Sequence, residues 1–258
     1  MPPLQILTPI NCDIDFDKGA SGTGEAYNAD SGKRLASELT GSHFVLCDAT
    51  VWEDQVQLFK QASDLSSYGM IYYVIANAGM RKKDQTFAFD GKDQEPQNPD
   101  LQIIDVNLMG ALYTSKLYFV TRNGTEVNKD QDTCLILISS GAGFIDVPRS
   151  PEYSSTKWAV RGIMHALRRT TSYYGSRVNV IEPCYIRTGI LSKDQFDHVE
   201  NSGVEFATAE DVGECVLRIL SDAGINRRTL FVCARKWAPR EYMDLNIEDY
   251  PERLIQEI

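Results

Sequence analysis

The sequence lacks a long apolar run, an excess of basic charge and a cluster of histidines. No segment stays apolar for the roughly 18 residues that a membrane-spanning helix needs. The net charge of -10 argues against a nucleic-acid partner, which would need a basic face, and against an anionic membrane surface. The 3 histidines form no H-E-x-x-H motif and no clustered spacing, so we predict no metal site.

Several signatures of other protein classes are also missing. The start of the chain has no basic region followed by an apolar run, so no signal peptide is predicted. There is no G-x-S-x-G motif, which argues against a serine hydrolase. Ser31-Gly32-Lys33 is no P-loop, because Tyr27 stands where that motif needs a glycine. The 6 cysteines are scattered, which is typical of a reduced protein. We therefore expect a soluble, cytoplasmic protein.

Apolar strand patterns and helical patterns alternate from residue 43 onwards. This alternation predicts one Rossmann-like α/β domain over residues 1–258, with a doubly wound, mostly parallel sheet and helices on both faces. Residues 1–42 are atypical, with a half-exposed strand pattern at 10–16, and 235–258 form a tail. Residues 80–99 and 183–206 are predicted loops. The predicted strands are 43–47, 70–76, 134–138, 177–181 and 229–234, and the predicted helices are 33–39, 52–65, 100–122, 151–174 and 208–221.

Tyr153 and Lys157 lie four residues apart in a predicted helix, so their side chains point the same way. A phenol has an ordinary pKa of about 10, but a nearby ammonium favours the phenolate. Such a pair can therefore make the tyrosine a general base for an alcohol proton. Ser140 follows the preceding predicted strand and is placed to hold the same alcohol.

Four candidate side chains come just after predicted strands: Asp48, Asn77, Ser140 and Pro183. Ligands of parallel sheets bind beyond the carboxyl ends of the strands, so these residues indicate one site. Taken singly, each candidate has a structural explanation: a serine caps a turn, an amide is buried, and a Tyr–Lys pair lies on a solvated face. Their joint order along the chain favours the functional interpretation.

These segments resemble the classical short-chain dehydrogenase/reductase family over residues 43–235. The resemblance rests on Asn77-Ala78-Gly79, Asn107 in DVNLMG, Ser140 in ISSGAG, the run from Tyr153 to Lys157, and Pro183 with Thr188. Within the family the chain is similar to 15-hydroxyprostaglandin-dehydrogenase-like members and to fungal 5'-hydroxyaverantin dehydrogenases. The resemblance implies an NAD(P)-dependent oxidoreductase that interconverts a secondary alcohol and a ketone by direct hydride transfer, in secondary (polyketide) metabolism.

The resemblance also implies a role for each residue. Tyr153 is the general base or acid, and Lys157 lowers the pKa of Tyr153 and holds the nicotinamide ribose. Ser140 binds the substrate oxygen, and Asn107 positions a water that relays the proton. The cofactor is NAD or NADP, with NAD favoured, and the protein is a dimer or tetramer formed through the helices at 100–122 and 151–174. The further cofactor-binding residues are Ser21, Gly22, Gly24, Asp48, Asn77, Ala78, Gly79, Pro183, Ile186 and Thr188.

The chain departs from the family pattern in its first part. Asp17 and Lys18 stand where the family has Thr-Gly, and Cys184 replaces the glycine after Pro183. The rest of the first helix and the second strand have no counterpart, a loss of about twenty residues given usual element lengths. That strand would carry the acidic residue that selects NAD over NADP. The alternative interpretation is a catalytically inactive family member that binds a small molecule or a partner.

Overall fold

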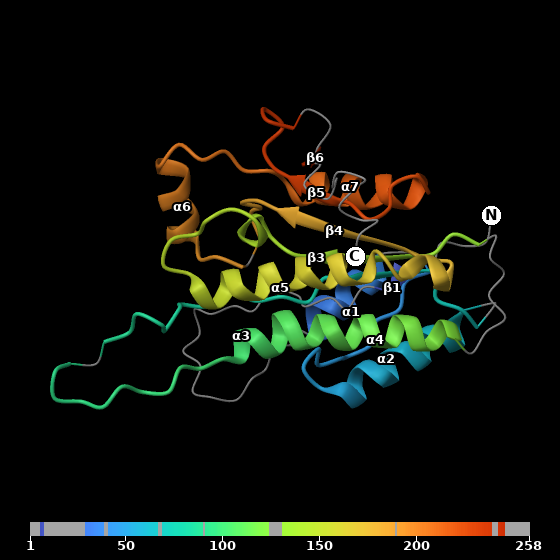
Figure 1. Cartoon of the computed structure of the whole chain (residues 1–258), viewed down its shortest axis with the longest axis horizontal. Coiled ribbons are helices and arrows are strands. Elements are labelled where there is room, and N and C mark those ends of the chain that lie inside the picture. Colours follow the sequence, from blue (N-terminus) through green and yellow to red (C-terminus); the bar gives the residue numbers. More distant parts are fainter. Residues whose placement is uncertain are drawn as a thin grey trace, which may run out of the picture.

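Figure 1 shows the computed structural model, which describes residues 6–7, 29–38, 41–66, 69–89, 91–123, 131–188, 190–238 and 242–245. Ser21, Gly22 and Gly24 lie outside these residues, as does the strand pattern predicted at 10–16. The predicted site residues from Asp48 to Thr188 all lie within them.

The described residues form one sheet of six strands in sequence order. The strands β1 to β5 are parallel, and β6 pairs antiparallel with β5. The predicted mostly parallel sheet is therefore confirmed. The strands are β1 Ile6–Leu7, β2 Tyr73–Ala76, β3 Cys134–Ile138, β4 Arg177–Pro183, β5 Thr229–Val232 and β6 Met243–Asp244.

Helices connect the strands and cover the sheet. A π-helical turn, Asp105–Met109, lies between α3 and α4, and short 3-10 turns follow β3 and α5. The helices are α1 Ala29–Glu38, α2 Trp52–Leu65, α3 Gln102–Ile104, α4 Gly110–Asn123, α5 Pro151–Leu167, α6 Lys193–Asn201 and α7 Ala209–Ser221.

Both faces of the sheet are buried, because successive strand residues point to opposite faces. On one face, Leu135 and Leu137 of β3 pack in a cluster with side chains of α2, α4 and α5. On the other face, Cys134 and Ile136 pack with side chains of α7. In Figure 1, α4 and α5 lie on one side of the strands and α7 on the other. The prediction of helices on both faces is confirmed.

Three predicted elements differ from the structure. Residues 43–47 form no strand, and the backbone N–H that follows them, that of Asp48, donates to the Asp54 carboxylate of α2 rather than to a sheet neighbour. The helix predicted to residue 174 ends at Leu167, because a 3-10 turn follows and Gly175 then takes a left-handed backbone conformation with φ 58°.

The third difference is α6, which lies inside the loop predicted at 183–206. A capping box starts this helix: the Ser192 hydroxyl accepts from the backbone N–H of Gln195, and the Gln195 side chain accepts from the backbone N–H of Ser192. The S-x-x-Q spacing was therefore a local signal for the helix that the sequence analysis missed.

Candidate active site

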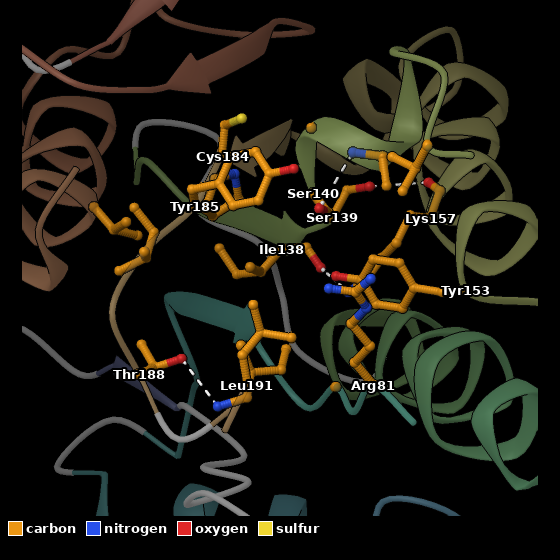
Figure 2. A pocket seen from close by; sticks show the side chains of 18 of the residues that line it. Arg81, Ile138, Ser139, Ser140, Tyr153, Lys157, Cys184, Tyr185, Thr188 and Leu191 are labelled. Atoms are coloured by element: carbon orange, nitrogen blue, oxygen red, sulfur yellow. Dashed lines mark hydrogen bonds between the residues drawn. The ribbon is translucent and has the colours of Figure 1, made fainter. Parts of the chain in front are cut away.

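The carboxyl ends of β2, β3 and β4 open into a cavity of about 370 Å³ (Figure 2). Asn77 follows β2 directly, Ser139 and Ser140 follow β3, and Pro183 ends β4. All four line the cavity, together with Tyr153 and Lys157 of α5. The parallel register of the three strands brings their ends to one edge, as the sequence pattern predicted.

Ser140 begins the 3-10 turn Gly141–Gly143. Its backbone is extended, and its hydroxyl accepts a hydrogen bond of 3.2 Å from the backbone N–H of Ala142. The same hydroxyl interacts with the phenol of Tyr153 and acts to lower the pKa of that phenol. Ser140 is therefore both the cap of the turn and a polar partner of Tyr153. The structural and the functional interpretation of this residue are compatible.

Ser139 and Gly143 fix this turn against α5. The Ser139 hydroxyl donates to the backbone carbonyl of Lys157 at 2.9 Å. A β-carbon added at Gly143 would lie 2.7 Å from Oε1 of the buried Glu182 and 2.8 Å from Oγ of Ser139. A larger residue would have to displace both of these side chains, so glycine permits the close approach that holds the end of β3 next to the helix that carries Tyr153 and Lys157.

Helix α5 begins at Pro151, a favoured first helical residue. Four residues apart on it, Tyr153 and Lys157 are 9% and 4% exposed, and Nζ of Lys157 lies 5.7 Å from the centre of the Tyr153 ring. Figure 2 shows both side chains turned toward Ser139 and Ser140. The predicted triad of Ser140, Tyr153 and Lys157 is therefore brought together in space.

The electrostatics of the pair differ from the sequence-based expectation. Burial raises the pKa of Tyr153, and the groups that act to lower it are the Ser140 hydroxyl and the charge of Arg81. Burial also lowers the pKa of Lys157 to about 8, against the charge of Glu182, which raises it. Desolvation thus outweighs charge pairing at both residues, and Arg81 takes the charge role that we expected of Lys157 alone.

Both polar atoms of the Asn107 side chain bond to protein partners. Oδ1 accepts from the backbone N–H of Met80 at 2.7 Å, while Nδ2 donates to the carbonyl of Met80 at 2.9 Å and to Oγ1 of Thr156 at 3.1 Å. Asn107 is 1% exposed and sits in the π-helical turn. Its side chain therefore ties the segment after β2 to α5, and the water relay stays a prediction.

The predicted cofactor residues fall into three groups. Asp48 and Ala78 are described but do not line the cavity; the Asp48 carboxylate accepts from the backbone and side chain of Thr50, in the turn before α2. The glycine-rich segment of Ser21, Gly22 and Gly24 lies outside the described residues. The predicted residues that line the cavity are Asn77, Gly79, Tyr153, Lys157, Pro183, Ile186 and Thr188.

The residues around Lys157 fit the nicotinamide end of a dinucleotide. An ammonium has three N–H donors. Among the described residues, Nζ of Lys157 donates to the backbone carbonyl of Ile138 at 3.4 Å. The other N–H groups of the ammonium are left to donate to ribose hydroxyls. A β-carbon at Gly79 would lie 3.3 Å from Nζ of Lys157, so glycine keeps this space open.

The residues that line the cavity include two sets, which we call the floor and the rim. The floor consists of Ser140, Tyr153 and Lys157. The rim consists of Arg81, from the loop after β2, and of Ile190 and Leu191, from the segment before α6. The sequence analysis assigned no role to any rim residue.

In the described part of the chain, the His, Cys, Asp and Glu side chains form no group of three or more that could hold a metal ion. None of its helices is both long and apolar enough to span a bilayer.

Comparisons with known proteins identify the family of this chain. A profile of the short chain dehydrogenase family matches residues 16–198. The chain is 30% identical over 201 residues to the 5'-hydroxyaverantin dehydrogenase of Dothistroma septosporum, covering 70% of this chain and 65% of that protein. It is 30% identical over 163 residues to a 5'-hydroxyaverantin dehydrogenase of Emericella nidulans, covering 58% and 53%. The chain thus spans between about half and two thirds of the length of these curated relatives.

A solved structure shows the same fold. The gluconate 5-dehydrogenase of Burkholderia cenocepacia, in complex with NADP and tartrate, aligns with a TM-score of 0.63 over 81% of each chain, at 18% identity. Its similarity supports the arrangement of the sheet and helices. Since the family profile covers more than half of the sequence, this chain belongs to the short-chain dehydrogenase/reductase family of oxidoreductases.

Proposed function

We propose that the protein is an NAD(P)-dependent dehydrogenase or reductase that interconverts a secondary alcohol and a ketone by direct hydride transfer. The observation that carries the proposal is the floor, where a buried phenol, a buried ammonium and a strand-end hydroxyl share one cavity. The two fungal relatives support a secondary-metabolite substrate for this chain.

The nicotinamide, when bound, supplies the hydride acceptor or donor. Ser140 holds the substrate oxygen, and Tyr153 exchanges the proton of that oxygen. Because burial raises the pKa of Tyr153, the phenol is protonated at neutral pH, and this is the form that donates a proton to a ketone. In the oxidative direction the Ser140 hydroxyl and the Arg81 charge favour the phenolate. Lys157 binds the ribose and keeps the cofactor against the floor.

Replacing Tyr153 by phenylalanine tests this role. We expect Tyr153→Phe to lower kcat by about 10²- to 10⁴-fold, the usual contribution of one general acid or base. The dissociation constant of NADH should stay nearly unchanged, because the ring remains. Tyr173→Phe is the matched control, since Tyr173 is 84% exposed and lies outside the cavity lining. Unchanged turnover in Tyr153→Phe would remove the assigned acid and base.

The second candidate is an inactive family member that binds without turnover. It is favoured by Asp17 and Lys18, which replace the family's Thr-Gly in the nucleotide half. Titrating NADH and NADPH while following their fluorescence separates the two candidates. Saturable binding supports the enzyme and shows which cofactor it prefers; an absence of binding at millimolar concentration supports the inactive form.

We also propose that the protein is a homodimer or homotetramer formed through α4 and α5. Large apolar side chains are exposed on both helices: Leu112 and Val120 on α4, and Trp158 on α5, are 40%, 47% and 48% exposed. Burying such side chains against a second copy would be favourable. Sedimentation equilibrium of the purified chain tests the proposal, and a monomer at micromolar concentration would contradict it.

A further inference from the structure

Arg81 brings a second positive charge into the cavity. It follows Met80 in the loop after β2, is half-buried and lines the cavity. The central carbon of its guanidinium lies 5.7 Å from the centre of the Tyr153 ring. Figure 2 shows the Arg81 side chain reaching up to Tyr153 from the loop. The guanidinium is therefore next to the proposed reaction centre.

The loop on both sides of Arg81 is anchored. The preceding residue, Met80, is 3% exposed, and both of its backbone polar groups bond to the Asn107 amide. The following residue, Lys82, forms an ion pair of 2.5 Å with Asp100. Two residues further on, the carboxylate of Asp84 accepts from the backbone N–H of Glu152 at the start of α5, at 2.7 Å. These anchors fix the backbone from which Arg81 extends, so its direction is set by the fold.

The charges that line the cavity are not balanced. Arg81 and Lys157 are the charged residues in the lining, and no carboxylate is among the described residues that line it. Lys157 has the buried carboxylate of Glu182 behind it, whose charge acts on its ammonium. No carboxylate of the described residues forms an ion pair with Arg81. A half-buried guanidinium beside a cavity, with no carboxylate partner among the described residues, can bind an anionic group of a ligand.

The remaining lining determines what kind of molecule carries that anion. Most of the side chains around the floor and Arg81 are apolar, which suits an apolar body with few polar groups. They include Ile145, Val147, Ile190, Leu191 and Phe196. An apolar molecule with one acidic group close to its carbonyl would satisfy the guanidinium and the apolar walls together.

We propose that Arg81 binds an anionic oxygen group of the substrate, a carboxylate or an ionised phenol, next to the carbon that exchanges hydride. This inference rests on the proposed function, because it names the class of alcohol or ketone that the floor acts on. A guanidinium presents two parallel N–H donors to such a group and so also orients the carbonyl toward Ser140 and Tyr153.

The test compares acidic ketones with neutral ones. The probes are meta- and para-acetylbenzoate and their methyl esters, with acetylphenols assayed above and below their phenol pKa as the ionised-phenol arm. We expect the intact enzyme to prefer each acid over its ester in kcat/KM. Arg81→Met should reduce that preference by about tenfold or more, mainly through KM, as for one lost charge-assisted contact. Arg81→Lys should keep part of the preference, because it keeps the charge.

Lys83→Met is the matched control, because Lys83 is an exposed cation of the same loop and does not line the cavity. It should leave the preference unchanged. Equal acid-to-ester ratios in the intact enzyme and in Arg81→Met would overturn the inference. An equal loss for acids and esters, with a shifted pH profile, would also overturn it, because Arg81 would then act on Tyr153 alone.

A binding measurement keeps the inference separate from the proposed function. The acetylbenzoates should raise the unfolding temperature of the intact protein more than their esters do, and Arg81→Met should remove this difference. If the temperature shift prefers the acids but no ketone is reduced with either cofactor, the proposed function fails and the anion site stands. If the ketones are reduced without any preference for acids, the proposed function stands and the anion site fails.

Discussion

The floor and the rim of the cavity are built in different ways. The floor stands on strand ends and on α5, and its surroundings are bonded repeatedly: Ser139 to Lys157, and Asn107 to Met80 and Thr156. The rim consists of side chains on connecting segments, where Ile190 and Leu191 present half-buried apolar surface. On the proposed function, the floor carries out the reaction, whereas the rim selects which molecule reaches it.

Among changes to the floor, Tyr153→Phe is expected to lower turnover most. Lys157→Met is expected to have the next largest effect. This change removes an ammonium from the cavity but keeps an apolar chain of similar length. We expect turnover to fall by about 10²-fold or more and the dissociation constant of the cofactor to rise by at least about tenfold, because one charge serves both roles. Steady-state kinetics and NADH fluorescence measure the two quantities. An effect on neither would contradict the double role, and an effect on turnover alone would contradict the ribose contact.

A smaller effect, on stability, is expected where the floor meets the rim. Asn107→Ala removes three hydrogen bonds and leaves the N–H and C=O of Met80 without their partner. We expect the free energy of unfolding to fall by about 2 kcal/mol, the cost of unsatisfied buried polar groups. Urea unfolding measures this change. Asn98→Ala is the control, because Asn98 is exposed and lies in the loop between β2 and α3. If both variants unfold alike, the Asn107 anchor has no importance for the fold.

The smallest effect is expected at the rim itself. Leu191→Ala shortens an apolar side chain of the cavity lining. We expect KM for an apolar ketone to rise by about three- to tenfold, in line with the loss of a few buried methylene groups, while kcat stays within about twofold. Leu217→Ala, at an exposed position of α7, should change neither constant. A fall in kcat that exceeds the rise in KM would show that Leu191 affects the reaction as a floor residue does. It would contradict the distinction between floor and rim.

The distinction between floor and rim also explains which site residues could be predicted from the sequence. The positions of the floor residues could be predicted. The side-chain direction of Tyr153 and Lys157 follows from helical spacing, and Asn77, Ser140 and Pro183 follow from the common edge of parallel strands. The first rule is local, and the second needs only the expectation that the strands form one parallel sheet. The buried strands were found for the same reason, because runs such as Cys134–Ile138 are apolar on both faces.

The rim could not be predicted in this way. Arg81 points into the cavity because Asn107, 27 residues beyond Met80, and Asp100 hold the loop around it, and no local pattern encodes such contacts. Residues 43–47 are apolar enough for a strand, but no described strand pairs with them. Position 48 therefore follows no strand, and its carboxylate bonds to Thr50 in a turn instead of entering the cavity.

The tight contact at Gly143 has a consequence for anyone who wants to redesign this protein. A side chain introduced there would have to displace the Glu182 carboxylate and the Ser139 hydroxyl, and that hydroxyl bonds to the backbone of Lys157. A library aimed at new substrates should therefore leave Gly143 unchanged. Diversity placed at Ile190 and Leu191 would change which substrates are accepted while the side chains of Ser140, Tyr153 and Lys157 stay in place.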